Sequence, residues 1–204
     1  MEIRNMLESD VPDIADIVLT TWEMETYGRE IARPSSEVYV LEHLYSRSFA
    51  KVAIVDGKAV GCIIGDVGTN RTGKIRGRER LSPRMEAISG MDGYKEYVSD
   101  MDIMHRGQET MLHDSGLSYD GEISLFIVSE TMRGRGIGKA LYMEALEIFR
   151  DNGCESIVIF TDNDCGYSFY DNMGCSRVAD TKVELDKELL HMMTYNLRLS
   201  YDNV

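Results

Sequence analysis

The stretch from residue 121 to residue 150, GEISLFIVSETMRGRGIGKALYMEALEIFR, decides the fold of this chain. Residues 123–128 form an apolar run that predicts a buried strand. The segment after Gly138 repeats apolar residues at helical spacing, and the arginines and glycines before it predict a tight turn. The pattern therefore predicts a strand, a turn and a helix in direct succession.

The turn has the composition of an anion site. Its glycines lack β-carbons, so several backbone N–H groups are free to converge on one anion, and the start of the helix adds partial positive charge. Three cations lie in the same turn. The glycines are Gly134, Gly136 and Gly138, and the cations are Arg133, Arg135 and Lys139. We interpret the segment as a cradle for a diphosphate.

Spacing excludes two common glycine-rich alternatives. A P-loop ending at Gly138 needs a glycine at position 133 and Ser or Thr after the lysine, where this chain has Arg133 and Ala140. A dinucleotide-binding fingerprint that starts at Gly134 needs glycine or alanine at position 139, which is Lys139. Neither register is met.

Two motifs in order do fit a known pattern. The first is Arg-x-x-Gly-x-Gly in residues 133–138, directly after the expected strand, and the second lies about thirty residues later in NDCGYSFYDNMGC, residues 163–175. The marked positions of the second are Asn163, Gly166, Phe169, Tyr170, Gly174 and Cys175. Together they resemble the acyl-CoA-binding turn and the following helix signature of the GCN5-related N-acetyltransferase (GNAT) superfamily. Cys175 and Gly166 depart from it slightly, because a bulky apolar residue and an alanine are usual there.

The resemblance implies a fold of the α/β (α+β) kind. Its central sheet is mixed and mostly antiparallel, is flanked by helices and is splayed at the central strands. The resemblance is strong over about the last 85 residues and looser over residues 1–66. Residues 67–118 have no counterpart in it, so we expect an insertion within one domain spanning residues 1–204. That insertion is interpreted as a lid, a dimer surface or ordinary core filling.

The N-terminal part predicts a strand at residues 2–7 followed by two helices. Ser9 or Asp10 is a candidate cap for the first helix, and Ser35 or Ser36 for the second. A hairpin should follow, because Asp-Gly at positions 56 and 57 separates two apolar runs. At the C-terminal end, residues 175–180 and 191–199 predict two closing strands.

The insertion has two parts of different composition. Residues 68–80, GTNRTGKIRGRER, predict an exposed and mobile loop with a basic patch, which would either be solvated or touch the phosphates of coenzyme A. The cations of the patch are Arg71, Lys74, Arg76, Arg78 and Arg80. The methionine-rich second part predicts one or two irregular helices. His105 and His113 lie there at a spacing that matches no metal pair, so we expect no metal.

Composition limits the partners. The 204 residues carry a net charge of −13, which disfavours nucleic acid and either favours a cationic substrate such as an amine or serves solubility alone. The sequence contains neither a leader nor a long apolar stretch, so we expect a cytoplasmic protein without membrane contact. Its four cysteines lack paired spacing, which favours reduced thiols. A homodimer is compatible with the insertion.

The resemblance also implies residue roles. Acetyl-CoA would bind as co-substrate, with its pantetheine arm along the strand end, its diphosphate on the turn and the Val128 N–H as oxyanion donor. The residues implied in this binding are Phe126, Ile127, Val128, Arg133, Gly134, Arg135, Gly136, Ile137, Gly138, Lys139 and Asn163. Tyr170 would protonate the departing thiolate, with Tyr167 as the alternative.

The base is predicted from strand parity. Glu122 is two, four and six residues before Ser124, Phe126 and Val128, so all four side chains should share one face of the strand. We therefore expect Glu122 to act as general base. The alternatives are Asp66, Asp120, Tyr119 and a chain of waters. Cys165 as a covalent acyl carrier is a further route.

The resulting functional expectation is an acetyl-CoA-dependent N-acetyltransferase that transfers the acetyl group directly to a primary amine of a small molecule or peptide. The alternative is a non-catalytic acyl-CoA sensor or a partner-docking module. RNA binding through the RGRG turn is a third reading, which the acidic composition opposes.

Overall fold

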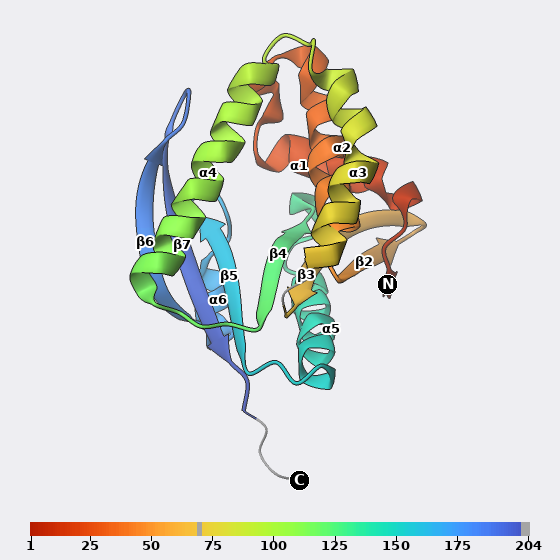
Figure 1. Cartoon of the computed structure of the whole chain (residues 1–204). Helices are drawn as coiled ribbons and strands as arrows, with labels where there is room; N and C mark the ends of the chain where they lie inside the picture. The colour runs from red at the N-terminus through yellow and green to blue at the C-terminus, as the bar shows by residue number, and fades with distance from the viewer. Residues whose placement is uncertain (69–70, 201–204) are drawn as a thin grey trace.

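The computed structural model describes residues 1–68 and 71–200, with backbone alone for residues 71–74. The described strands form a seven-stranded sheet in the order β1-β2-β3-β4-β5-β7-β6 (Figure 1). The strands are β1 (Glu2–Asn5), β2 (Phe49–Val55), β3 (Lys58–Val67), β4 (Gly121–Val128), β5 (Ser156–Asp162), β6 (Ser176–Glu184) and β7 (Leu189–Arg198). Neighbours pair antiparallel, except that β4 and β5 are parallel. The mixed, mostly antiparallel sheet predicted from the resemblance is thus confirmed.

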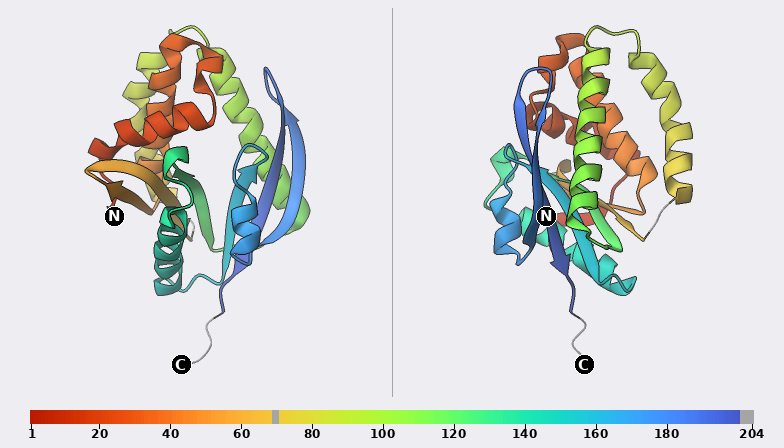
Figure 2. Two further views of the ribbon diagram at one scale, coloured as in Figure 1. Left: turned by 180° about the vertical axis from the view of Figure 1, so that it is seen from behind. Right: turned by 60° about the vertical axis from the view of Figure 1, so that its left-hand side comes forward.

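Helices cover both faces of this sheet (Figure 2). The helices are α1 (Val11–Thr21), α2 (Arg29–Ser46), α3 (Arg71–Ile88), α4 (Tyr94–Ser115), α5 (Ile137–Asp151) and α6 (Ser168–Asn172), with short 3-10 turns η1 (Glu8–Asp10), η2 (Met24–Tyr27) and η3 (Glu130–Met132). One apolar core lies between α1, α2 and the β2–β4 part of the sheet. A second lies under α5 and joins β5 and β7, and a small third one joins α4 to β6 and β7.

The sheet is splayed at its parallel pair. β4 and β5 pair only at Gly121–Ile157, Glu122–Val158 and Ile123–Ile159, and beyond this point the two strands separate (Figure 1). The register of β3 against β4 shifts at the same level, so that Ser124 is the extra residue of a β-bulge. A bulge bends its strand, which here turns β4 away from β5.

The bulge also reverses the faces of β4. Ile123 packs in the same core cluster as Phe126 and Val128, whereas Leu125 and Ile127 pack in the cluster under α1 and α2. Glu122 therefore points to the α2 side, opposite to Phe126 and Val128. The prediction that these side chains share one face is wrong, because the alternation that it assumed is interrupted at the bulged residue.

The predicted hairpin is confirmed, and its turn has the expected geometry. Asp56 and Gly57 have φ values of 51° and 79°, so both lie in the left-handed region that a two-residue type I′ turn requires. The two closing strands are confirmed as β6 and β7, joined by a tip at residues 185–188.

The second helix begins earlier than predicted. α2 starts at Arg29, so Ser35 and Ser36 lie inside it rather than at its cap. Both hydroxyls donate to the carbonyl oxygen of Ala32, at 3.1 and 2.7 Å. The first turn is held by packing of the fully buried Ile31, which local sequence does not reveal.

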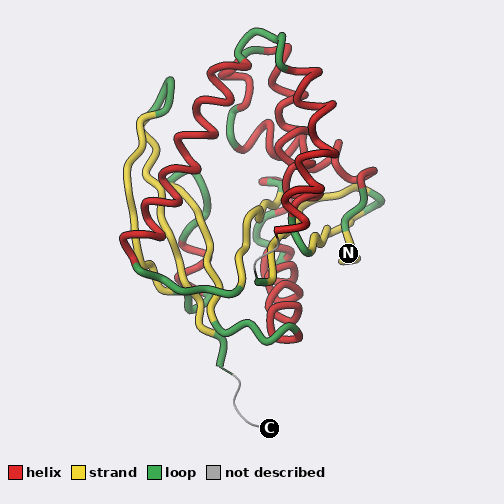
Figure 3. Tube along the Cα trace, viewed as in Figure 1, coloured by secondary structure: helices red, strands yellow, loops and turns green. Residues whose placement is uncertain are grey.

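The basic segment predicted as a loop is helix α3, drawn in red in Figure 3. It lies along α2, and a β-carbon at Gly77 would come within 2.9 Å of Ser46 Cα, so glycine is required for this close approach. Arg80 stacks on the Tyr45 ring at 3.8 Å and pairs with Glu8. Packing against α2 thus overrides the weak helix propensity of the segment. The side chains of Arg71 and Lys74 lie outside the described residues.

The methionine-rich part of the insertion forms the end of α3 and the whole of α4, in agreement with the prediction of one or two helices. Helix α4 lies against β6 and β7 through Met111 and neighbouring apolar side chains. Within residues 1–68 and 71–200, no helix is long and apolar enough to cross a membrane.

Candidate active site

A cleft of about 990 Å³ occupies the splay between β4 and β5. Its walls come from elements that are far apart in the sequence. They are the end of α1, η2, α2, α4, β4, the glycine turn, the end of β5 with the start of α6, and the tip of the β6–β7 hairpin. The splay of the sheet therefore opens a cavity that both the glycine turn and the insertion reach.

One edge of β4 faces this cleft without a strand beside it. Among the described residues, β5 covers that edge only as far as Ile123. On the other edge, the Ser129 N–H donates to the Val60 carbonyl oxygen of β3 at 2.9 Å. Because successive residues of a strand direct their N–H groups to opposite edges, the N–H of Val128 is directed toward the cleft. This edge is available to an extended ligand.

The glycine turn follows this edge directly. Gly134 and Gly136 have φ values of 75° and 80°, and Gly136 is the residue before α5. Such left-handed positions make a concave array of N–H groups at a helix start, which favours anions. The side chains of Arg133, Arg135 and Lys139 are exposed. No carboxylate lies within ion-pair distance of them in the part of the chain that the structure describes.

Tyr170 reaches the cleft from α6. Its side chain is only 7% exposed, and its ring lies 5.5 Å from the Tyr195 ring and 6.5 Å from the Phe126 ring. Burial is the main reason that the pKa of its phenol is raised. The hydroxyl therefore carries its proton at neutral pH. Tyr167, the alternative acid, is 39% exposed and is not part of the cleft wall.

Glu122 lines the cleft as expected, but as half of an ion pair. Its carboxylate lies 3.3 Å from Arg47 Nη1, and the same nitrogen lies 3.0 Å from the buried Asp66. The carboxylate is therefore occupied by a cation of the chain itself, which opposes a role as general base. Asp66 is held further by the Ser48 N–H at 2.8 Å.

The other predicted side chains also have structural partners. Asp120 accepts the N–H groups of Glu155 and Ser156 at 2.9 Å, which anchors the start of β5. Asn163 accepts the His191 N–H at 2.7 Å and does not line the described cleft. The structure thus places Asn163 at the β5–β7 junction rather than beside the glycine turn.

Cys62, Cys165 and Cys175 are free thiols, and Cys165 lines the cleft. Burial and then the nearby Asp162 carboxylate raise the pKa of the Cys165 thiol to about 12. A thiol with such a pKa is almost entirely protonated at neutral pH and is a weak nucleophile. This opposes the covalent route. In the described ranges, no group of three His, Cys, Asp or Glu side chains is placed to hold a metal ion.

The half of the cleft away from the glycine turn, called the far half below, contains residues to which sequence analysis gave no role in the site. They are aromatic, methionine, histidine and acidic side chains: Trp22, Tyr27, Tyr39, His43, Met101, Met104, Asp162, Asp164 and Glu188. Burial raises the pKa of Asp162 and of Glu188, and neighbouring carboxylates add to the effect. Asp162 ends β5 next to the second motif, which was a usable signal. The others come from η2, α2, α4 and the hairpin tip, and no local pattern joins them.

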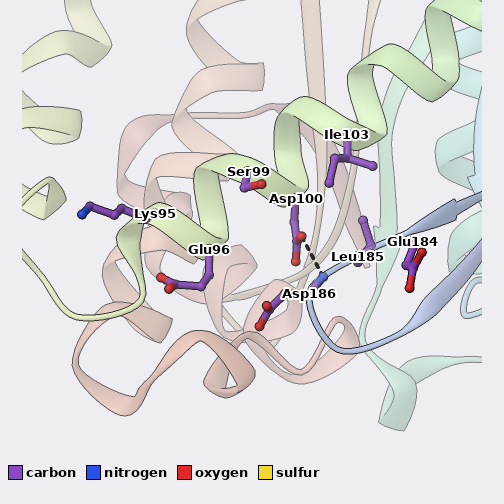
Figure 4. Close-up of a pocket in the computed structure, with 8 residues that line it drawn as sticks. All are labelled: Lys95, Glu96, Ser99, Asp100, Ile103, Glu184, Leu185 and Asp186. Carbon is purple, nitrogen blue, oxygen red and sulfur yellow. Dashed lines mark hydrogen bonds between the residues drawn. The ribbon is translucent and has the colours of Figure 1, made fainter.

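A clasp closes this half of the cleft. Asp100 of α4 is buried and accepts the Tyr27 hydroxyl at 3.0 Å and the Asp186 N–H at 3.1 Å. Lys187 of the hairpin tip donates to the carbonyl oxygen of Thr26. Figure 4 shows Asp100 bonded to the hairpin across a recess of about 450 Å³. Through Asp100, the insertion therefore holds both η2 and the hairpin tip beside the cavity.

Removing the clasp should loosen the hairpin. In Asp100→Ala, amide exchange over residues 184–189 should accelerate by roughly tenfold or more, because each hydrogen bond to a carboxylate contributes about 1.5–3 kcal/mol. Hydrogen exchange read by mass spectrometry measures this. The matched control is Asp102→Ala on the same helix, which removes only an exposed pair with Arg106. Equal exchange in both variants would contradict the clasp.

Together, a mixed sheet splayed at a parallel pair and a glycine turn at the mouth of the splay define a protein of the GNAT fold. Residues 104–175 match the family model described as Acetyltransferase (GNAT) family. This confirms the resemblance to the GNAT superfamily that the two motifs predicted. No curated protein has a sequence that matches the chain.

Solved structures share the fold over the whole chain. One is ribosomal-protein-alanine N-acetyltransferase from Brucella melitensis, with 15% identity and a TM-score of 0.57 over 98% of this chain and 100% of that chain. An aminoglycoside 6'-N-acetyltransferase complexed with coenzyme A has 14% identity and a TM-score of 0.60 over 100% of both chains. The putative acetyltransferase yncA from Salmonella typhimurium, with its cofactor acetyl-CoA, has 14% identity and a TM-score of 0.57 over 100% of this chain and 96% of that chain.

Proposed function

We propose that this protein is an acetyl-CoA-dependent N-acetyltransferase that transfers the acetyl group directly to a primary amine of a small molecule or peptide. One observation carries the proposal. The uncovered edge of β4 leads directly into the glycine turn, and the buried phenol of Tyr170 lies in the same cleft. An anchored thioester and a proton for its leaving group are what direct acyl transfer requires.

The residues of the half of the cleft that includes the glycine turn, called the donor half below, fit acetyl-CoA. The N–H groups of Gly134, Gly136 and the first turn of α5 would hold the diphosphate, with the unpaired cations beside it. The edge of β4 would pair with the pantetheine arm, and the Val128 N–H would meet the thioester oxygen. Two solved structures of the same fold contain coenzyme A or acetyl-CoA, which supports this choice of donor.

An amine acceptor is supported by the charge of the far half. Carboxylates of Asp162, Asp164 and Glu188 line it and would attract an ammonium group. The acidic net charge of −13 acts in the same direction. Free cysteines support a reducing, cytoplasmic location.

The test combines binding with turnover. Calorimetry should detect acetyl-CoA binding, and a thiol reagent should detect coenzyme A release that depends on an added amine, over a panel of polyamines, amino acids, aminoglycosides and peptide N-termini. Binding without amine-dependent release would instead indicate a non-catalytic acyl-CoA sensor. Absence of binding would refute the donor assignment and the proposal with it.

A further inference from the structure

His43 of α2 lines the cleft and has a defined tautomer. Its Nδ1 lies 2.8 Å from the carbonyl oxygen of Tyr39, which only accepts hydrogen bonds. Nδ1 must therefore carry the proton, and in the neutral ring Nε2 then holds a free lone pair. Across the described residues, no hydrogen bond to this Nε2 is found. A basic nitrogen is thus oriented by its own helix and left available.

The surroundings keep this ring neutral. Burial is the main cause that lowers the pKa of His43, and the nearby Arg47 and His105 act in the same direction. Glu42 and the bond to the Tyr39 carbonyl oppose it. Glu122 of β4 also lines the cleft, and its carboxylate is paired with Arg47, which also pairs with Asp66.

The ring of His43 packs against another aromatic ring of α2 in the cleft wall. The Tyr39 ring lies 4.6 Å from the His43 ring. Burial raises the pKa of Tyr39 and of Tyr170, and for both phenols the Cys165 thiol and the Asp162 carboxylate contribute further. His43, Tyr39 and Tyr170 all line the same cleft, together with Asp162 and Cys165 at and after the end of β5. His43 comes from α2 and Tyr170 from α6.

We propose that His43 Nε2 is the general base that takes a proton from the acceptor ammonium, in the cleft that Tyr170 serves as general acid. The proposal rests on the function proposed above. It replaces the expected base Glu122, whose carboxylate is committed to Arg47.

These assignments give the following balance of protons and bonds. His43 takes one proton from the ammonium, and the freed nitrogen lone pair forms the N–C bond while the carbonyl electron pair moves to oxygen. When the C–S bond breaks, its electron pair goes to sulfur, which takes the phenolic proton of Tyr170. The second proton of the new amide nitrogen then restores the Tyr170 phenol, and His43 releases its proton to solvent. The products are the amide, free thiol and one proton.

The decisive variant is His43→Asn, whose amide still donates to the Tyr39 carbonyl but lacks a basic nitrogen. With the best amine of the panel, kcat/KM should fall about 100-fold, within the range of general base catalysis. The acidic inflection that His43 gives to the wild-type pH profile of kcat/KM should be lost, which leaves only the dependence on the fraction of free amine, and the Kd for acetyl-CoA should stay within about twofold. The control is His113→Asn, because His113 lies at the exposed end of α4 and outside the cleft wall. This variant should have the kcat/KM of the wild type.

A second readout does not need turnover. Nitrogen NMR of the ligand-free protein should show His43 protonated on Nδ1 alone at neutral pH, with a midpoint below the ordinary value of 6.5. A charged ring or the opposite tautomer would overturn the proposal even in an active enzyme. So would normal turnover in His43→Asn, or a larger loss in Glu122→Gln. If wild type binds acetyl-CoA yet acetylates no amine, the proposed function fails and this role fails with it.

Discussion

Replacing Tyr170 by phenylalanine should lower kcat about 100-fold while the Kd for acetyl-CoA changes by less than about twofold, because general acid catalysis contributes roughly 10²- to 10⁴-fold. The ring is 7% exposed and packed among aromatic neighbours, so Phe keeps the packing and removes only the hydroxyl. Steady-state kinetics and calorimetry on the same preparation separate the two effects.

Tyr142 offers a matched control for this change. It is fully buried in the same aromatic cluster, but its hydroxyl interacts with the Cys175 sulfur at 3.2 Å and does not reach the described cleft wall. Tyr142→Phe should therefore change stability more than turnover. A parallel loss of kcat in both variants would show that aromatic packing, and not the proton of Tyr170, limits the rate. Loss of acetyl-CoA binding in Tyr170→Phe would contradict the separation of roles.

Replacing Gly136 by valine should weaken acetyl-CoA binding by roughly tenfold or more, equivalent to about 1.4 kcal/mol. The φ of Gly136 is 80°, and a β-branched residue disfavours this region strongly, so the N–H groups before α5 would turn away from the diphosphate. Titration calorimetry with acetyl-CoA measures the change.

Gly153 provides the control at the other end of the same helix. Its φ is 73°, and an added β-carbon would meet no atom within 4 Å, as at Gly136. Gly153→Val should carry a similar strain and lower the melting temperature to a similar extent. Only Gly136→Val should weaken the binding of acetyl-CoA. Equal losses of affinity would assign the effect to strain in α5 instead of to the cradle.

The sequence predicted the donor half because its residues are contiguous. Strand, turn and helix follow one another in residues 121–150, and their spacing alone excludes the P-loop and dinucleotide registers. The Asp56-Gly57 hairpin was predictable for the same reason, since the turn type depends on two adjacent residues.

The wrong predictions concern features that depend on contacts between segments far apart in the sequence. A bulge at Ser124 reversed the parity on which the choice of Glu122 depended, and bulges depend on pairing with β3. Helix α3 forms on a glycine-rich and arginine-rich segment because Gly77 lets it pack closely on α2. His43 received no role because its tautomer and its place in the cleft exist only once α2 is folded against the sheet.

The sequence by itself determined the family resemblance, the glycine turn before α5 and the position of the tyrosine that follows in the second motif. These are local properties, because backbone conformation and residue spacing within thirty residues suffice to specify them. The tertiary structure alone decided which carboxylates are paired, which side chains form the far half of the cleft and which nitrogen is left free to accept a proton. Those properties arise from contacts between elements up to 161 residues apart, such as Lys187 with Thr26, and no local pattern encodes them.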